Sequence, residues 1–144
     1  MAARNTARKR AFQILFEGDQ RGVDVPTVLA DWIRHSRSDT RQPPVSEFTM
    51  ELVEGYATYA KRIDELISQY SVGWTLDRMP VVDRNILRLG AYELIWVDAT
   101  PDAVVLDEAV QLAKEFSTDE SPAFVNGLLG RFKDLKPTLR RDDA

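Results

Sequence analysis

Positive charge is concentrated in the first ten residues of this chain. Arg4, Arg8, Lys9 and Arg10 lie there with no acidic residue between them, whereas residues 11–144 hold 15 basic and 23 acidic residues. A cation cluster at one end of an acidic protein is typical of a polyanion-binding site. The alternative is a solubilising, frayed N-terminus. Charge alone leaves both interpretations open.

Residues suited to catalysis or metal binding are scarce. The chain has no cysteine and one histidine, His35, in an Arg- and Ser-rich stretch. This composition excludes a disulfide framework and the usual Cys/His zinc site, and no glycine pattern fits a phosphate-binding loop. We therefore expect no catalytic residues, no metal site and no cofactor, and we interpret His35 as a solvated surface residue.

Length and hydropathy indicate one globular domain. The chain has 144 residues, of which 44% are hydrophobic and 29% charged, and this size fits a single core. No apolar run approaches the roughly 20 residues of a membrane span, and the start lacks a signal-peptide core. We expect a cytoplasmic protein that does not enter a membrane.

Apolar residues recur every three or four positions along most of the chain. This spacing predicts helices over 6–20, 26–33, 46–70, 81–97, 105–116 and 121–132, and no segment alternates with the period of a strand. The 46–70 segment is either one long helix or two helices with a break near Lys61. The 81–97 segment is apolar on most faces, so it is expected at the centre. The predicted fold is an all-α, single-domain bundle of six or seven helices.

Three segments are predicted to lie outside regular structure. Residues 36–44 contain Arg, Ser, Asp, Thr and two prolines and are interpreted as a loop. Residues 1–5 and 137–144 are expected to be loosely ordered. Ser121 is predicted to cap the last helix, with Pro122 at its first position.

Four blocks of sequence, at 7–16, 74–94, 107–117 and 121–129, resemble the NusB family of bacterial transcription antitermination factors. The blocks cover most of the chain in order, and only 22–45 lacks a useful match. The resemblance implies an all-helical fold of two helical subdomains. It also implies binding to the boxA element of ribosomal RNA leader transcripts. The implied partners are the small-subunit ribosomal protein NusE and the RNA polymerase antitermination complex.

The first helix has residues suited to single-stranded RNA. Its four cations can contact phosphates, which supply most of the affinity and its salt dependence. Lys9, Gln13 and Phe16 share one helical face, where the amide can read a base edge and the ring can stack on a base. The alternative is that Phe12 and Phe16 belong to the core, which is the favoured interpretation for Phe12 and an equal one for Phe16.

Charged residues also interrupt the apolar 81–97 segment and the helix after it. Arg88 and Glu93 are interpreted as members of structural ion pairs, because buried charges must be paired. Arg84 lies nearer the start of its helix and is predicted either to pair or to reach RNA. Lys114 faces away from its helix's apolar stripe, so it is expected either to extend the RNA surface or to be a solvated charge.

A separate acidic corner precedes the last helix. Asp119 and Glu120 there favour the positive end of a helix, and Phe124 lies off the helix's apolar stripe. An outward phenylalanine beside carboxylates suits a basic partner. The family resemblance implies that this corner contacts NusE.

Two other classes of function were weighed against RNA binding. A helical scaffold or homodimer without RNA binding fits the same helical pattern. NusB-like domains also occur in RNA 5-methylcytosine methyltransferases, but that chemistry needs a cysteine nucleophile and a cofactor-binding domain. Because the chain has no cysteine and no residues for a second domain, it is predicted not to be an enzyme.

Overall fold

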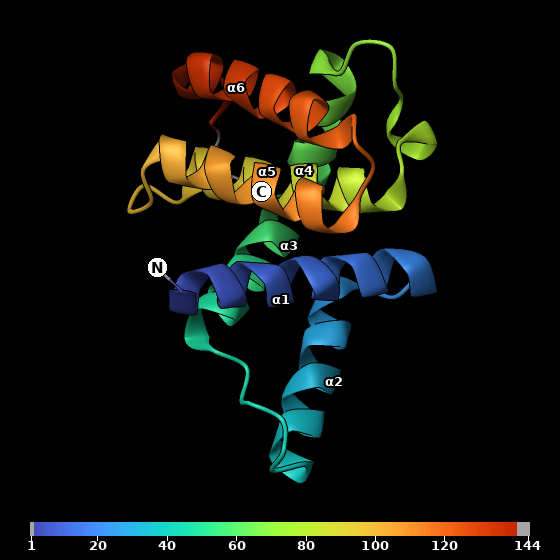
Figure 1. Ribbon diagram of the computed structural model, residues 1–144, viewed down its shortest axis with the longest axis vertical. Coiled ribbons are helices and arrows are strands. Elements are labelled where there is room, and N and C mark those ends of the chain that lie inside the picture. Colours follow the sequence, from blue (N-terminus) through green and yellow to red (C-terminus); the bar gives the residue numbers. More distant parts are fainter. Residues whose placement is uncertain (1, 141–144) are drawn as a thin grey trace.

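A computed structural model of the chain describes residues 2–140, which contain six α-helices, one short 3-10 helix and no strand (Figure 1). The predicted all-α bundle is therefore confirmed. The helices are α1 (Ala2–Arg21), α2 (Val25–Ser38), α3 (Glu47–Tyr70), α4 (Val81–Trp96), α5 (Asp102–Phe116) and α6 (Ser121–Leu139), with the 3-10 helix η1 at Leu76–Arg78.

Side-chain caps set where two of the helices begin. The carboxylate of Asp24 accepts the amide of Thr27 at 3.2 Å and starts α2. The hydroxyl of Ser46 accepts a hydrogen bond from the amide of Thr49 at 3.2 Å and starts α3. From there α3 continues without a break past Lys61, so the single long helix is the correct alternative.

Several predicted boundaries differ from the structure. Helix α2 extends to Ser38, so the loop begins at residue 39 rather than 36. Residues 2–5 and 137–139 are helical where loose ends were expected, and residues 1 and 141–144 lie outside the described part. Ser121 is the first residue of α6 rather than its cap, because its hydroxyl donates to Asp83 instead (2.8 Å).

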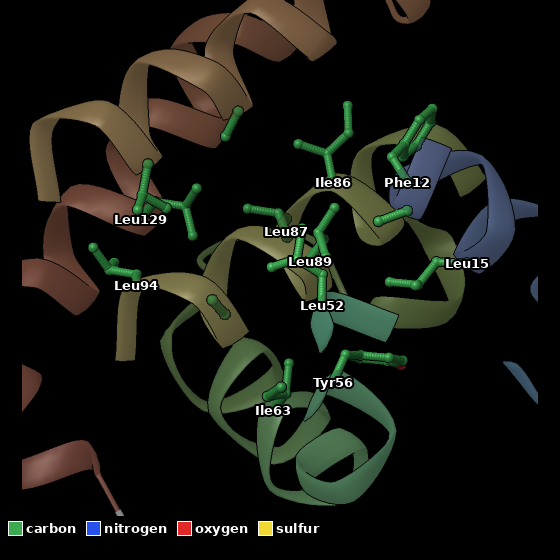
Figure 2. Packing of buried hydrophobic residues seen from close by; sticks show 14 of the residues in the cluster. Phe12, Leu15, Leu52, Tyr56, Ile63, Ile86, Leu87, Leu89, Leu94 and Leu129 are labelled. Carbon is green, nitrogen blue, oxygen red and sulfur yellow. The ribbon is translucent and has the colours of Figure 1, made fainter. Parts of the chain in front are cut away.

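Helix α4 forms the centre of the core, as its all-round apolar character predicted. Figure 2 shows Ile86, Leu87 and Leu89 of α4 in the middle of the core. Side chains of α1 and α3 lie on one side of them, and Leu129 of α6 lies on the other. All four are 3% exposed or less. The close packing around α4 leaves no room for a side chain at Gly90, where an added Cβ would lie 2.8 Å from a methyl group of Leu129.

The helices form two subdomains. Helices α1, α2 and the first half of α3 pack together, and α4, α5 and α6 form a second group (Figure 1). Ion pairs join the two groups at α4: Arg84 to Asp19 at 2.7 Å and Arg88 to Asp19 at 3.1 Å. The C-terminal end of α1, which carries Asp19, is thereby fixed against the second subdomain.

Candidate functional site

The start of α1 lies along α5, although the two are about a hundred residues apart in sequence. Asn5 donates from Nδ2 to Oε2 of Glu108 at 2.6 Å, and the ammonium of Lys9 pairs with Glu115. The Lys9 Nζ also lies 5.4 Å from the ring centroid of Phe116. These contacts hold the basic head against α5, the helix that also carries the exposed Lys114.

Arg8 is buried, and its predicted contact with RNA is wrong. Its side chain is 4% exposed and holds Glu93 of α4 through Nε and Nη2, at 2.8 and 2.7 Å. Burial opposes the charged guanidinium, but the hydrogen bond and charge of Glu93, with the charge of Glu108, raise the pKa of Arg8 above its ordinary value. This pair also confirms the structural interpretation of Glu93.

The other two arginines of the head contact the protein from its surface. Arg4 is exposed, and its guanidinium lies 4.3 Å from the ring centroid of Phe48. Arg10 donates to the carbonyl oxygen of Pro44 at 2.9 Å and lies 5.5 Å from the Trp32 ring. Arg10 thus holds the 39–46 loop against α1, whereas Arg4 keeps donors available to a ligand.

Gln13 and Phe16 are both half-buried on α1. The Phe16 ring lies 6.1 Å from Phe12, which in turn lies 5.3 Å from Phe116. Phe12 is 3% exposed, which confirms its place in the core. Phe16 packs against this core on one side and keeps part of its ring exposed, so a base can still reach it.

Arg84 is half-buried in an ion pair, which supports the pairing alternative for this residue over an RNA contact. It donates to both carboxylate oxygens of Asp19, at 2.7 and 3.0 Å, and to the carbonyl of Leu76 at 3.3 Å. Arg88 pairs with Asp64 and Asp19, as its structural interpretation predicted. The sequence could not distinguish these roles, because the partner Asp19 lies 65 residues away.

The same network sets the acidity of Asp19. Burial opposes its ionisation, but hydrogen bonds from Arg84 and Asn85 and the charges of both arginines outweigh this effect. Together they lower the pKa of Asp19 below its ordinary value of 3.8. Asp19 is therefore a charged tie between α1 and α4 at neutral pH.

The acidic corner is open to a partner. Asp119 and Glu120 are exposed and make no ion pair within residues 2–140, and Phe124 is half-buried. The Phe124 ring packs edge-on against Trp74, with centroids 5.1 Å apart and planes at 76°. Trp74 is 37% exposed. The sequence pattern did not single out Trp74, although a large aromatic residue between turn residues was the available signal.

The backbone of this corner is held by a buried carboxylate. Asp83 of α4 is fully buried and accepts hydrogen bonds from the hydroxyls of Ser117 and Ser121. Thr118 also hydrogen-bonds Ser121 at 2.9 Å. Because these residues form the turn between α5 and α6, the network fixes the position from which Asp119, Glu120 and Phe124 project.

Comparison with known proteins decides the family. Residues 5–134 match the NusB family. The chain is 89% identical over 142 residues to the transcription antitermination protein NusB of Streptomyces coelicolor, covering 99% of this chain and all of the relative. It is 88% identical over 144 residues to that of Streptomyces avermitilis, covering both chains completely. The chain belongs to the NusB family.

Solved structures of NusB proteins have the same fold. Thermotoga maritima NusB superimposes with a TM-score of 0.78 at 33% identity, covering 91% of this chain and 90% of that one. A chain from a crystal structure of antitermination factors NusB and NusE in complex with double-stranded RNA gives 0.79 at 28% identity, covering 93% and 98%. NusB-family membership also confirms that the chain is a non-catalytic antitermination factor rather than an enzyme.

The remaining sequence expectations concern features outside this surface. His35 is exposed on α2, where its Nδ1 lies 2.7 Å from the carbonyl oxygen of Asp31. Within residues 2–140, His, Asp and Glu side chains form no group of three that could hold a metal ion. The helices that the structure describes are too short or too polar to cross a membrane.

Proposed function

We propose that this NusB-family chain binds single-stranded boxA RNA of ribosomal RNA leader transcripts together with NusE, and so acts in the RNA polymerase antitermination complex. The observation that supports this most is the packing of the α1 head along α5. It brings accessible cations and a half-exposed ring of α1 against α5, whose C-terminal end leads into the acidic corner. The NusB–NusE complex with RNA among the similar structures supports both partners.

The RNA side of the proposal uses the accessible residues of α1 and α5. Arg4, Lys9 and Lys114 supply positive charge for phosphates, and Gln13 and Phe16 supply an amide and a ring for bases. Lys9 is already paired with Glu115, so phosphate must compete with that carboxylate. Because of this competition and the overall charge of −4, we expect the chain alone to bind RNA weakly and a partner to tighten the binding.

The NusE side of the proposal uses the acidic corner. Asp119 and Glu120 attract a basic protein, and Phe124 with Trp74 offers an apolar anchor ringed by charge. The corner follows directly after the last turn of α5, which carries Lys114 and Glu115. A protein bound at the corner therefore lies next to the RNA surface and can add its own cations to it.

Salt-dependent RNA titration tests the RNA surface. Changing Arg4, Lys9 and Lys114 together to alanine should flatten the dependence of log K on log salt by about 2 units, since each phosphate contact on single-stranded RNA contributes roughly 0.7. The matched control changes Arg34, Arg37 and Arg41, three exposed arginines at the far end of α2 and in the following loop. Equal flattening in both triple variants would contradict the proposed surface.

Sizing chromatography beside the titration tests the scaffold alternative. A homodimer without RNA binding predicts a concentration-dependent dimer and no binding of RNA by the wild-type chain. The RNA-binding proposal predicts that RNA binds the monomer and that the triple alanine variant keeps the same elution volume.

A further inference from the structure

A groove lies between α3 and the end of α4, away from the acidic corner. Its volume is about 520 Å³. It is lined mainly by Phe48, Glu51, Glu54 and Gly55 of α3 and by Tyr92 and Trp96 of α4. The NusE proposal does not use this groove, and the RNA proposal uses only Arg4, which lies over Phe48 at one end of it.

The groove has an aromatic wall. The rings of Tyr92 and Trp96 are nearly parallel, at 15° with centroids 6.3 Å apart, and Tyr59 stacks on Trp96 at 4.4 Å. Gly55 makes this wall possible, because a Cβ there would lie 1.9 Å from the Tyr92 hydroxyl. The ring of Tyr92 therefore lies directly across the backbone of α3, half-buried and with one side open to the groove.

The rim of the groove is acidic. Glu51 and Glu54 are exposed and form no ion pair among the residues that the structure describes, and Asp98 lies at one end. Burial, the neighbouring Tyr59 and the charges of Glu51 and Glu93 raise the pKa of Tyr92. The charge of Glu51 is thus close enough to affect Tyr92 of the aromatic wall. The groove therefore combines aromatic ring faces with the unpaired negative charges of Glu51 and Glu54.

Arginines of the chain itself already occupy both ends of this groove. The guanidinium of Arg4 lies 4.3 Å from the ring centroid of Phe48 at one end. Arg140 pairs with Asp98 at 2.8 Å at the other. The middle, between Glu51, Glu54 and Tyr92, combines the two kinds of group that hold these arginines separately, a ring as at Arg4 and carboxylates as at Arg140.

We propose that this groove docks an extended, arginine-containing basic peptide segment of a partner protein, with one guanidinium over Tyr92 between Glu51 and Glu54. A planar guanidinium stacks on a ring and pairs with carboxylates at the same time, which an ammonium does less well. Phe48 and Thr58 are ten residues apart on α3, about 15 Å, so the groove spans four or five extended residues. Three carboxylates disfavour a nucleic acid there.

Calorimetric titration with defined peptides tests the proposal on the full chain. The probe is an acetylated, amidated decapeptide of alternating arginine and glycine, with lysine and glutamate versions for comparison. We expect the arginine peptide to bind most tightly and the glutamate peptide not to bind. The double substitution Glu51→Gln/Glu54→Gln should weaken arginine-peptide binding at least fivefold.

A matched control separates the groove from general acidity. Glu65→Gln/Asp134→Asn removes the same charge from α3 and α6 outside the groove and should change binding less than twofold. Gly55→Ala should also weaken binding with every carboxylate in place, because it displaces the Tyr92 ring. If Gly55→Ala does not fold, as judged by circular dichroism, Tyr92→Leu replaces it with the same expectation.

Three results would overturn the proposal. The first is that the wild type does not bind the arginine peptide. The second is that the two charge variants weaken peptide binding equally. The third is that the wild type binds single-stranded RNA more tightly than the arginine peptide and that the groove substitutions remove this RNA binding. The inference does not rest on the RNA and NusE proposals. RNA titration of Glu51→Gln/Glu54→Gln should match the wild type, so failure of one proposal is distinguishable from failure of the other.

Discussion

The basic head of α1 and the acidic corner before α6 differ in how far the protein already uses their charges. Each of the four head cations contacts the protein: Arg8 is buried against Glu93, and Lys9 is paired with Glu115. At the corner, Asp119 and Glu120 are exposed without an ion pair in the described chain. Lys9 of the head therefore has to exchange partners to bind, whereas the corner does not.

This difference shows that charges in one cluster can have two roles, holding the structure together or binding a partner. Arg8 keeps the head attached to α4, and Arg10 holds the 39–46 loop against α1. These two arginines therefore position the other two head cations. The corner is positioned by Asp83 and neighbouring hydroxyls instead, which leaves all its carboxylates for a partner. A charge cluster in a sequence thus predicts a surface, but its internal partners decide which members can bind.

The largest effect is expected when the buried ion pair between Arg8 and Glu93 is broken. Arg8→Ala leaves Glu93, which is 2% exposed, without its partner, and should lower the free energy of unfolding by about 3–5 kcal/mol. Urea denaturation measures this loss. Arg10→Ala is the control and should cost less than about 1 kcal/mol, because its bonds are to exposed carbonyls.

The Arg8 experiment has a clear contrary result. If Arg8→Ala and Arg10→Ala were equally stable and both weakened RNA binding, Arg8 would be a ligand contact rather than a structural tie. Replacing both partners, as Arg8→Met with Glu93→Leu, should recover most of the stability, since apolar residues of similar volume can replace a buried pair.

The next effect concerns the corner. Phe124→Asp removes the proposed anchor and should weaken NusE binding by at least about 2 kcal/mol, measured by calorimetry. Trp74→Ala should weaken it as well, because the two rings pack together. Phe124→Leu is the control and should retain the fold and more of the affinity. A fall in melting temperature above about 5 °C with unchanged NusE affinity would instead assign Phe124 to the core.

The tie between α1 and α4 predicts a dependence of stability on pH. Because the pKa of Asp19 is lowered on folding, its contribution is present above the ordinary value of 3.8 and is lost as pH falls through the folded value. At pH 7, Asp19→Asn should lower the free energy of unfolding by about 2 kcal/mol. The difference from wild type should shrink below pH 4, whereas Asp134→Asn should match wild type throughout. A difference that stays constant from pH 7 to pH 3 would contradict this role.

The smallest effect is expected when Lys9, one of the proposed RNA contacts of the head, is released from its ion pair. Glu115→Gln removes the carboxylate that holds Lys9 and should tighten RNA binding by less than about 1 kcal/mol, the usual range for an exposed pair. Fluorescence anisotropy with labelled RNA measures it, and Glu65→Gln removes the same charge elsewhere as the control. Weaker RNA binding in Glu115→Gln would mean that Glu115 positions Lys9 for RNA instead of competing for it.

Local pattern was enough to predict most of the fold. The central position of α4 and the inward place of Phe12 follow from apolar periodicity, which burial in the bundle enforces. Helix ends were less predictable. Ser121 has the residue type of a cap, but a buried carboxylate 38 positions earlier binds its hydroxyl. Such tertiary hydrogen bonds override local preference.

The sequence proposes a location for the candidate site, but it says less about which residues are free to belong to it. Charge and aromatic residues indicated α1, α5 and the corner, but Arg8 and Arg84 belong to internal ion pairs. Their partners, Glu93 and Asp19, are 85 and 65 residues away, so no spacing rule reveals them. Trp74 was missed for a related reason, because its contact with Phe124 exists only after folding.

The most direct test is an anisotropy titration of a labelled boxA-like RNA with the full chain, at physiological salt, with and without NusE. The account predicts that NusE tightens binding of the boxA-like RNA at least tenfold, about 1.4 kcal/mol, and tightens binding of a scrambled RNA much less. Equal affinities with and without NusE, or equal tightening for both RNAs, would contradict a joint surface for RNA and NusE.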